Sequence, residues 1–439
     1  MKKAGLSSLF LFALMLMCSI FVFTSCDIGG HEHTMGAWYT ITEATCTTEG
    51  ENRRDCNTCD YYDTVTIPPI GHAYNSSFGA CDTCGKFASA LAYERIGNGY
   101  CITGIGTCTD TDILIPATIN SLPVTSIGGT AFYDCDSLTS VSIPDSVTSI
   151  GDFAFSDCSG LTSVTMPGSV TSIGDFAFSD CSGLTSVTMP GSVTSIGDGA
   201  FRYCNSLKSI TIPDSVTSIG DAAFSDCSEL TNIDVQPGNT EYHSSGNCLI
   251  ETKSKTLIWG CNGLTSIALP YSVTSIGDWA FAGCDSLKSI AIPDSVTSIG
   301  DATFYGCSGL TSISIPNSVT SIGDAAFYGC VALTSITVPN GISFIGDYTF
   351  YDCKSLTGIA IPDSVTSIGD SAFKGCSGLT SIIIPNSVTS IGFSAFDGCD
   401  SLTSVYYVGT AEAWGRITIK SGNANLTNAT RYYYSETAP

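Results

Sequence analysis

The chain has 439 residues, of which 43% are hydrophobic and only 13% are charged, and it contains 45 glycines. This composition favours a regular, turn-rich β architecture over a helical enzyme. The formal net charge of −24 argues against nucleic acid as a partner, because phosphate binding needs clustered lysine and arginine side chains.

The N-terminus indicates export. Two lysines precede an apolar segment, residues 9–23, that is shorter than a membrane-spanning helix requires. The following Phe-Thr-Ser-Cys resembles a loose bacterial lipobox. By that resemblance residues 1–25 form a signal peptide, Cys26 becomes the lipidated first residue, and residues 26–30 form a linker. An ordinary signal peptide and an uncleaved anchor are the alternatives. We expect a protein that is exported and lipid-anchored at the bacterial cell surface (outer membrane) or secreted, and that contacts membranes only through this anchor.

Residues 31–90 are rich in cysteine and differ from the rest of the chain. Two C-x-x-C pairs separated by 21 residues resemble a zinc ribbon, in which each pair supplies two tetrahedral thiolate ligands. The candidate ligands of a structural zinc ion are Cys56, Cys59, Cys81 and Cys84. Disulfides compete with zinc in an exported chain, and free thiols or a ligand set that includes a histidine are further alternatives. Zinc or disulfides would explain how a segment with so little core stays folded.

Residues 91–125 are predicted to form an N-terminal cap. The apolar and polar residues from Tyr93 to Gly106 are typical of a hairpin that could cover the first coil of a repeat structure. Such a cover is needed because an open end exposes core side chains and unpaired strand edges.

Beyond the cap, cysteines recur at a fixed interval. Every step is 23 residues except the step from Cys227 to Cys261, which is 34 residues. A period in the twenties indicates a solenoid, in which each short unit stacks on copies of itself. The repeated cysteines are Cys135, Cys158, Cys181, Cys204, Cys227, Cys261, Cys284, Cys307, Cys330, Cys353, Cys376 and Cys399.

One unit of this repeat, residues 151–173, shows how a coil is built. The spacing L-x-x-L-x-L at residues 161–166 predicts a short strand, and Pro167 ends it because proline cannot donate to a continuing ladder. A second extended stretch follows at residues 169–173. A Gly-Asp turn comes next, and we expect Asp175 to cap a single helical or 3₁₀ turn. Stacked coils would place equivalent strands about 4.8 Å apart.

The consensus C-x-x-L-x-x-L-x-L-P-x-S-V-x-x-I-G-x-x-A-F resembles the BspA-like (Treponema-type) leucine-rich repeats of bacterial surface proteins. The resemblance extends over residues 91–439 and implies a β-rich α/β solenoid at residues 126–405. This solenoid would be a right-handed superhelix or horseshoe of 23-residue coils with parallel β-strands. It also implies a surface used for adhesion to host or matrix macromolecules. Matching residues are Cys158, Leu161, Val164, Met166, Pro167, Val170, Ile173, Gly174, Ala177 and Phe178.

Serine replaces asparagine at the position where leucine-rich repeats commonly carry an asparagine ladder. A serine hydroxyl can still bond the backbone of the neighbouring coil, although more weakly than an amide. These serines include Ser146, Ser169, Ser192 and Ser215.

The repeat is interrupted once and ends in a second cap. At about residues 236–260, two apolar runs flank a polar Thr-Lys-Ser-Lys, which predicts a hairpin insertion. A tolerated insertion and a ligand-contacting hairpin are the two interpretations. Residues 406–439, which are rich in tyrosine, are predicted to form the C-terminal cap.

The repeated cysteines are predicted to be a ladder of reduced, buried thiols. Stacking places them about 4.8 Å apart with parallel Cα–Cβ bonds. A disulfide instead needs Cβ atoms about 3.8 Å apart and side chains turned toward each other. The thiols would then act as small hydrophobic groups. Disulfides between some coils are the alternative.

Two sets of outward side chains are candidates for a binding surface. On the first strand these residues are mostly threonine and serine, and the residue between the last two inward positions varies from coil to coil. Such variation favours recognition, although drift at exposed positions would look the same. Tyrosines after Ala-Phe in successive coils predict an aromatic ladder, for which stacking alone is the alternative. The candidates are Thr162, Thr165, Thr188, Thr211, Tyr305, Tyr328 and Tyr351.

An enzyme is not expected. The repeat region holds one histidine, His243, and the chain has no H-E-x-x-H, G-x-S-x-G or phosphate-binding motif. No cofactor is expected for the solenoid, and zinc is considered only for residues 31–90. The sequence therefore predicts a non-catalytic surface protein that binds extracellular host, matrix or cell-surface proteins. A structural, shielding surface coat without a specific ligand is the alternative.

Overall fold

The computed structural model describes residues 37, 39–42, 50–55, 62–67, 91–106, 110–260 and 263–434. These residues fall into two compact units, residues 1–87 and residues 88–439.

The described part of the first unit is a small antiparallel sheet. Its strands β1 (Tyr39–Thr42), β2 (Gly50–Asp55) and β3 (Tyr62–Ile67) pair in the order β1-β2-β3. The predicted lipidation site Cys26 lies outside the described residues, as do the predicted zinc ligands. Both sites stay predictions.

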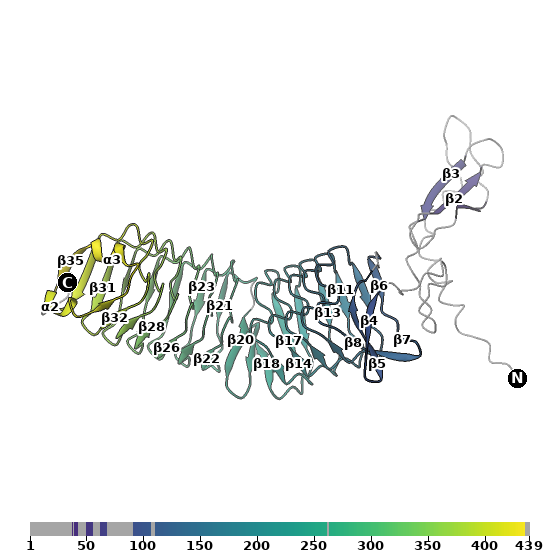
Figure 1. Ribbon diagram of the computed structural model, residues 1–439, viewed down its shortest axis with the longest axis horizontal. Coiled ribbons are helices and arrows are strands. Elements are labelled where there is room, and N and C mark those ends of the chain that lie inside the picture. The colour runs from purple at the N-terminus through teal and green to yellow at the C-terminus, as the bar shows by residue number, and fades with distance from the viewer. Residues whose placement is uncertain are drawn as a thin grey trace. The chain divides into compact units, whose positions relative to one another are not determined.

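The second unit is a parallel-strand solenoid, in which each regular coil contributes one strand to each of two sides (Figure 1). Equivalent strands of adjacent coils pair in parallel with a register of one repeat, so that Val164 lies opposite Val187 and Ile173 opposite Ile196. Together with the 23-residue period, this register confirms the predicted solenoid fold. The hydrophobic spacing therefore dictates the stacking.

The first strands of the regular coils follow the L-x-x-L-x-L spacing, and strands at both ends of the solenoid extend the same side. They are β6 (Asp112–Leu114), β9 (Ser140–Ser142), β11 (Ser163–Thr165), β13 (Ser186–Thr188), β15 (Ser209–Ile212), β17 (Asn232–Val235), β21 (Ser266–Ala268), β23 (Ser289–Ala291), β25 (Ser312–Ser314), β27 (Ser335–Thr337), β29 (Gly358–Ala360), β31 (Ser381–Pro385), β33 (Ser404–Val408) and β35 (Thr430–Tyr433).

The second strands follow the proline in the regular coils and form the other side of the solenoid. They are β5 (Gly99–Gly104), β8 (Leu122–Ile127), β10 (Ser149–Ile150), β12 (Ser172–Ile173), β14 (Ser195–Ile196), β16 (Ser218–Ile219), β20 (Thr256–Gly260), β22 (Ser275–Ile276), β24 (Ser298–Ile299), β26 (Ser321–Ile322), β28 (Phe344–Ile345), β30 (Ser367–Ile368), β32 (Ser390–Ile391) and β34 (Thr418–Ile419).

The core is filled by the side chains that the consensus places inward. In the coil that begins at Leu161, both Leu161 and Phe178 are completely buried, and Ile173 is 2% exposed. The phenylalanines form two stacks with ring centroids 5.0 to 5.9 Å apart, within the range that favours aromatic pairs. We call these stacks the phenylalanine ladder: Phe132, Phe155, Phe178, Phe201 and Phe224, then Phe281, Phe304, Phe327, Phe350, Phe373 and Phe396.

Polar side chains add hydrogen bonds between successive coils. The hydroxyl of Ser169 donates to the carbonyl of Val147 at 2.5 Å, and that of Ser192 donates to Val170 at 2.6 Å. Serine thus bonds the neighbouring backbone at this position, as the sequence suggested. A second row is formed by threonines, in which Thr171 donates to the carbonyl of Thr148 at 3.1 Å. The polar residues of the repeat therefore connect coils as well as facing water.

The turn aspartates form a third row, and here the sequence-based expectation was wrong. Phe176, directly after Asp175, has a φ of 54°, and the segment forms a turn without a helix. The carboxylate of Asp175 does not cap its own turn. It accepts the backbone N–H of Asp198 in the next coil at 2.9 Å. We call this row, which begins at Asp152 and is interrupted after Asp221, the aspartate ladder.

The interrupted coil is a three-stranded antiparallel segment. Strand β18 (Tyr242–Ser245) pairs with β19 (Cys248–Glu251), and β19 pairs with β20. Strand β20 then takes the place of a second strand, because Thr256 and Leu257 pair in parallel with Ser275 and Ile276 of β22. The insertion therefore starts a new parallel sheet on which the C-terminal coils stack.

This segment also lies between two hydrophobic cores. Leu249 and Trp259 pack into the N-terminal core, whereas Ile250 and Leu257 pack into the C-terminal core. Leu249 and Ile250 are successive residues of β19, so their side chains point to opposite faces. On β20 the register shifts at Ile258, and this irregularity lets Leu257 and Trp259 reach opposite cores although they are two residues apart. One strand pair thus contributes to both halves of the solenoid.

Additional elements lie at the two ends of the solenoid. At the N-terminal end, β4 (Ala92–Ile96) pairs antiparallel with β5, and β7 (Thr118–Ile119) pairs antiparallel with β8. At the C-terminal end, β34 pairs with β32 and β35 pairs with β33, with the short helices α2 (Ala411–Trp414) and α3 (Ala424–Asn428) between them. The C-terminal segment therefore continues both sides of the stack.

Candidate binding surfaces

The first strands of the coils present a row of exposed threonines. Thr162, Thr165, Thr188 and Thr211 are all exposed, while Val164 between two of them is buried. The Thr162 hydroxyl donates to the carbonyl of Thr139 at 3.3 Å, so part of its bonding capacity connects coils. These four side chains are uncharged and short. They can offer hydroxyl groups to a ligand, whereas the equivalent position in later coils carries the larger Ile383 and Tyr406.

The predicted tyrosines form a continuous stack. Ring centroids are 4.6 Å apart between Tyr305 and Tyr328, and 4.5 Å apart between Tyr328 and Tyr351, with planes inclined by 11° and 3°. Trp279 extends the stack, 5.3 Å from Tyr305. All three tyrosines are half-buried. Burial, and then the neighbouring tyrosines, raise the pKa of Tyr328, so its hydroxyl stays uncharged at neutral pH.

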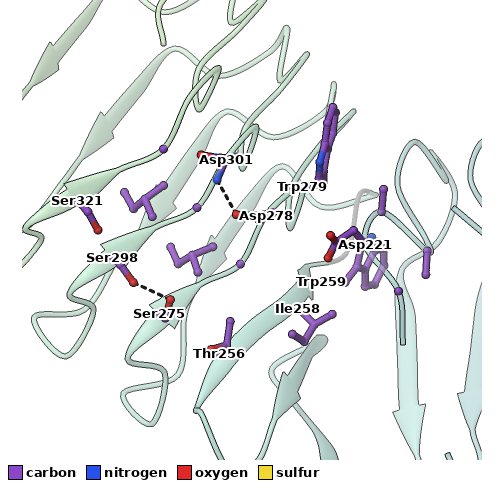
Figure 2. Close-up of a pocket in the computed structure, with 18 of the residues that line it drawn as sticks. Asp221, Thr256, Ile258, Trp259, Ser275, Asp278, Trp279, Ser298, Asp301 and Ser321 are labelled. Carbon is purple, nitrogen blue, oxygen red and sulfur yellow. Dashed lines mark hydrogen bonds between the residues drawn. The ribbon is translucent and has the colours of Figure 1, made fainter. Parts of the chain in front are cut away.

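A groove lies where the repeat is interrupted (Figure 2). It has a volume of about 480 Å³ and is lined by the turn at residues 219–224, by β20, and by the second strands and turns of the following coils as far as Phe344. It exists because Leu257 is followed by Ile258-Trp259-Gly260 in place of the Gly-Asp turn of a regular coil. The missing turn leaves space between the turns on either side. We call this space the junction groove.

Three aspartates line the junction groove. Asp301 donates its backbone N–H to Asp278 at 2.6 Å, and Figure 2 shows this pair on successive coils. Asp221 is the last member of the aspartate ladder before the interruption, and no described residue donates a hydrogen bond to its carboxylate. Burial, then the charges of Asp198 and Asp278, raise the pKa of Asp221. The groove thus concentrates negative charge around an unpaired carboxylate.

The comparisons with known proteins identify the family. The model of the family described as BspA type leucine rich repeat region, with six copies, matches residues 125–248, 254–343 and 297–420. The chain belongs to this family. The resemblance inferred from the consensus is therefore confirmed. No curated protein matches the chain.

Several solved structures resemble this BspA-type protein. A leucine rich cell surface protein from Faecalibacterium prausnitzii is 31% identical, with a TM-score of 0.54, over 76% of this chain and 97% of that one. A leucine-rich repeat protein from Eubacterium ventriosum is 26% identical, with a TM-score of 0.56, over 78% and 92% of the two chains. The pneumococcal vaccine antigen PcpA, 19% identical with a TM-score of 0.55 over 80% and 98%, shares the fold.

The BspA-type cysteines occupy equivalent places in successive coils. Of the predicted ladder, Cys261 lies outside the described residues, Cys135 is half-buried, and the others are buried. Most donate to the carbonyl of a phenylalanine 26 residues earlier; Cys181, for example, lies 3.1 Å from the Phe155 oxygen. The thiols therefore hydrogen-bond between coils as well as packing as small apolar groups.

These thiols are expected to be unreactive in the folded protein. Burial raises the pKa of Cys158, Cys353 and Cys399 to about 12, so almost no thiolate is present at pH 8. Alkylation of the native protein followed by peptide mapping should label Cys135 before any other described member of the ladder. Unfolding without reductant should then expose the remaining thiols. Loss of thiols in pairs under those conditions would instead indicate disulfides between coils.

The junction groove is the feature that the repeat pattern did not reveal. The step of 34 residues between cysteines marked the interruption, and the break in the Gly-Asp turns between Asp221 and Asp278 was also visible in the sequence. Which residues line the groove depends on how β20 pairs with the following coil. Among the described residues there is no cluster of metal-binding side chains, and none of the helices is long and apolar enough to cross a membrane.

Proposed function

We propose that this BspA-type protein is a non-catalytic cell-surface protein that adheres to extracellular host, matrix or other cell-surface proteins through its solenoid. The tyrosine stack carries this proposal. Tyr305, Tyr328 and Tyr351 present half-buried aromatic rings on rigid, consecutive coils. Tyrosine is enriched in protein interfaces because it supplies large contact area at low entropic cost.

Family membership and sequence support the rest of the proposal. The Faecalibacterium prausnitzii relative is described as a cell surface protein, and the apolar N-terminal segment with its lipobox-like sequence fits export and attachment through Cys26. The repeated architecture places equivalent residues in equivalent surroundings, which favours an extended contact surface over a single catalytic centre. Partners would be extracellular proteins, and the membrane would be contacted only through the lipid.

The test is saturable binding of the purified full-length chain to immobilised extracellular matrix proteins. Tyr328→Ala should weaken binding about tenfold or more, as expected for an aromatic anchor. Tyr271→Ala is the matched control, because Tyr271 is 87% exposed and belongs to no aromatic pair in the described structure. Equal affinities of the two variants would contradict a role for the stack. Absence of saturable binding to every protein tested would favour a shielding coat.

A further inference from the structure

We propose that the junction groove binds a lysine or arginine side chain carried by an extended segment of a protein partner. This inference deepens the proposed function, since it names a site and the chemistry of the partner. The groove is a place where the aspartate ladder lacks its usual neighbour. A cationic group from another molecule would fill the position that the missing turn leaves open.

The charge of Asp221 is unmatched within the described structure. In regular coils the turn carboxylate accepts the N–H of the next turn, as Asp198 does from Asp221 at 2.9 Å. Asp221 itself has no such donor among the described residues, and Asp278 and Asp301 line the same groove. None of the described residues that line it is lysine, arginine or histidine. A bound cation would compensate the repulsion among these carboxylates.

A nearby basic residue does not supply this compensation. The guanidinium of Arg202 lies 5.8 Å from the centroid of the Trp279 ring, but its Nε pairs with the carboxylate of Asp226 at 3.3 Å. Its other contact is the ring and hydroxyl of Tyr203. Arg202 therefore pairs with residues of its own coil and of the next coil, and it is not among the residues that line the groove.

Elsewhere in the chain, a lysine ammonium group occupies a groove of the same kind. A smaller groove of about 270 Å³ lies on the equivalent second strands and turns near the C-terminal end. There the Nζ of Lys420 is 3.3 Å from Oδ1 of the ladder residue Asp370 and 4.5 Å from the centroid of the Phe393 ring. The carboxylate of Asp370 and the ring face of Phe393 thus hold the same cation. The junction groove offers carboxylates together with Trp279 and Phe344, without a lysine of its own.

Other occupants fit the groove less well. A metal ion would need several converging ligands, and the described residues hold no group of three or more such side chains. A neutral ligand would also cover the Asp221 carboxylate without pairing its charge, which is unfavourable. The open groove of about 480 Å³ is large enough for one or two side chains of a segment lying along it.

The test uses two labelled peptides and the full-length chain. One peptide alternates glycine with lysine, and the other has the same sequence with every lysine acetylated. Fluorescence anisotropy should show binding of the first peptide that weakens as salt is added, and much weaker binding of the second. Asp221→Asn should weaken binding of the lysine peptide about tenfold, because a charge-assisted hydrogen bond is lost.

Asp175→Asn is the matched control. It removes the same charge from the same ladder, outside the groove, and the asparagine oxygen can still accept the N–H of Asp198. Binding should stay within twofold of the unchanged chain, and both variants should unfold at the same temperature as that chain. Equal weakening by both variants would assign binding to net charge and overturn the proposal. Unchanged binding in Asp221→Asn, or equal binding of the acetylated peptide, would also overturn it.

The two proposals can fail separately. If a matrix protein binds saturably and Asp221→Asn binds it as well as the unchanged chain does, the junction groove is not the site and the adhesive function stands. If no matrix protein binds but the lysine peptide distinguishes Asp221→Asn from Asp175→Asn, the groove stands and the adhesive function fails.

Discussion

Trp259→Ala is expected to lower the free energy of unfolding by about 3–5 kcal/mol and to separate the unfolding of the two halves of the solenoid. Trp259 lies on β20, in the interrupted coil, and is 2% exposed. Its ring is 6.1 Å from that of Phe224, the last member of the N-terminal phenylalanine stack. Removal of the indole would leave a cavity at the point where the two cores meet.

A hydrogen bond adds to this cost. The indole Nε1 of Trp259 donates to the carbonyl of Phe224 at 3.1 Å. In regular coils the equivalent carbonyl accepts from a thiol, as Phe201 does from Cys227 at 3.0 Å. Trp259 thus supplies a hydrogen bond to this carbonyl, and its ring contacts Phe224 where the N-terminal phenylalanine stack ends. Alanine would leave a buried carbonyl without its donor, which costs about 1–3 kcal/mol where no water can enter.

The two halves of a solenoid can unfold in separate transitions because each coil contacts only its neighbours. Cooperativity between the halves therefore depends on the interrupted coil. Calorimetry of the full-length chain should show one main transition for the solenoid before substitution and two after Trp259→Ala. Trp279→Ala is the control, since Trp279 is half-buried beside the same junction. A single transition at an unchanged temperature in Trp259→Ala would contradict the expected role of Trp259.

The repeat made most of the solenoid predictable, because one spacing fixes many residues at once. Leu161, Ile173 and Phe178 were expected inside and are buried, and the order of Tyr305, Tyr328 and Tyr351 in the sequence implied the stack that the structure shows. These conclusions needed only the period and the principle that equivalent residues occupy equivalent places. They hold wherever a coil has regular neighbours.

Two features could not be derived in this way. Asp175 follows a glycine at a turn, which is also the pattern of a helix cap, and only the stacking shows that its carboxylate reaches the next coil. The junction groove depends on which residues of the insertion join the parallel sheet. The sequence does not state that Thr256 and Leu257 take the place of a Ser-Ile pair. Where the repeat is interrupted, the pairing of the strands determines which residues reach the surface, and the sequence pattern alone does not give that pairing.

Phe304→Ala is expected to destabilise the C-terminal coils by about 3–5 kcal/mol. Phe304 is fully buried, and its ring stacks between those of Phe281 and Phe327 at 5.4 and 5.3 Å. Alanine would remove two aromatic contacts and open a cavity in a core that cannot collapse without shifting the backbone of several coils. Phe344→Ala is the matched control: Phe344 is 47% exposed, and its loss should cost less than about 1 kcal/mol.

A double-substitution cycle tests whether the phenylalanine ladder acts as a continuous stack. Phe304→Ala and Phe327→Ala should be less destabilising together than the sum of the two, because both remove the same contact. Phe304→Ala combined with Phe178→Ala should be additive, since Phe178 lies in the other core. Chemical denaturation, followed by circular dichroism, measures each value. Additivity in both pairs would mean that the rings contribute only through separate burial. Coupling confined to the adjacent pair would show that stability passes from coil to coil through ring contacts, as expected for a stack in which each coil is held by its neighbours.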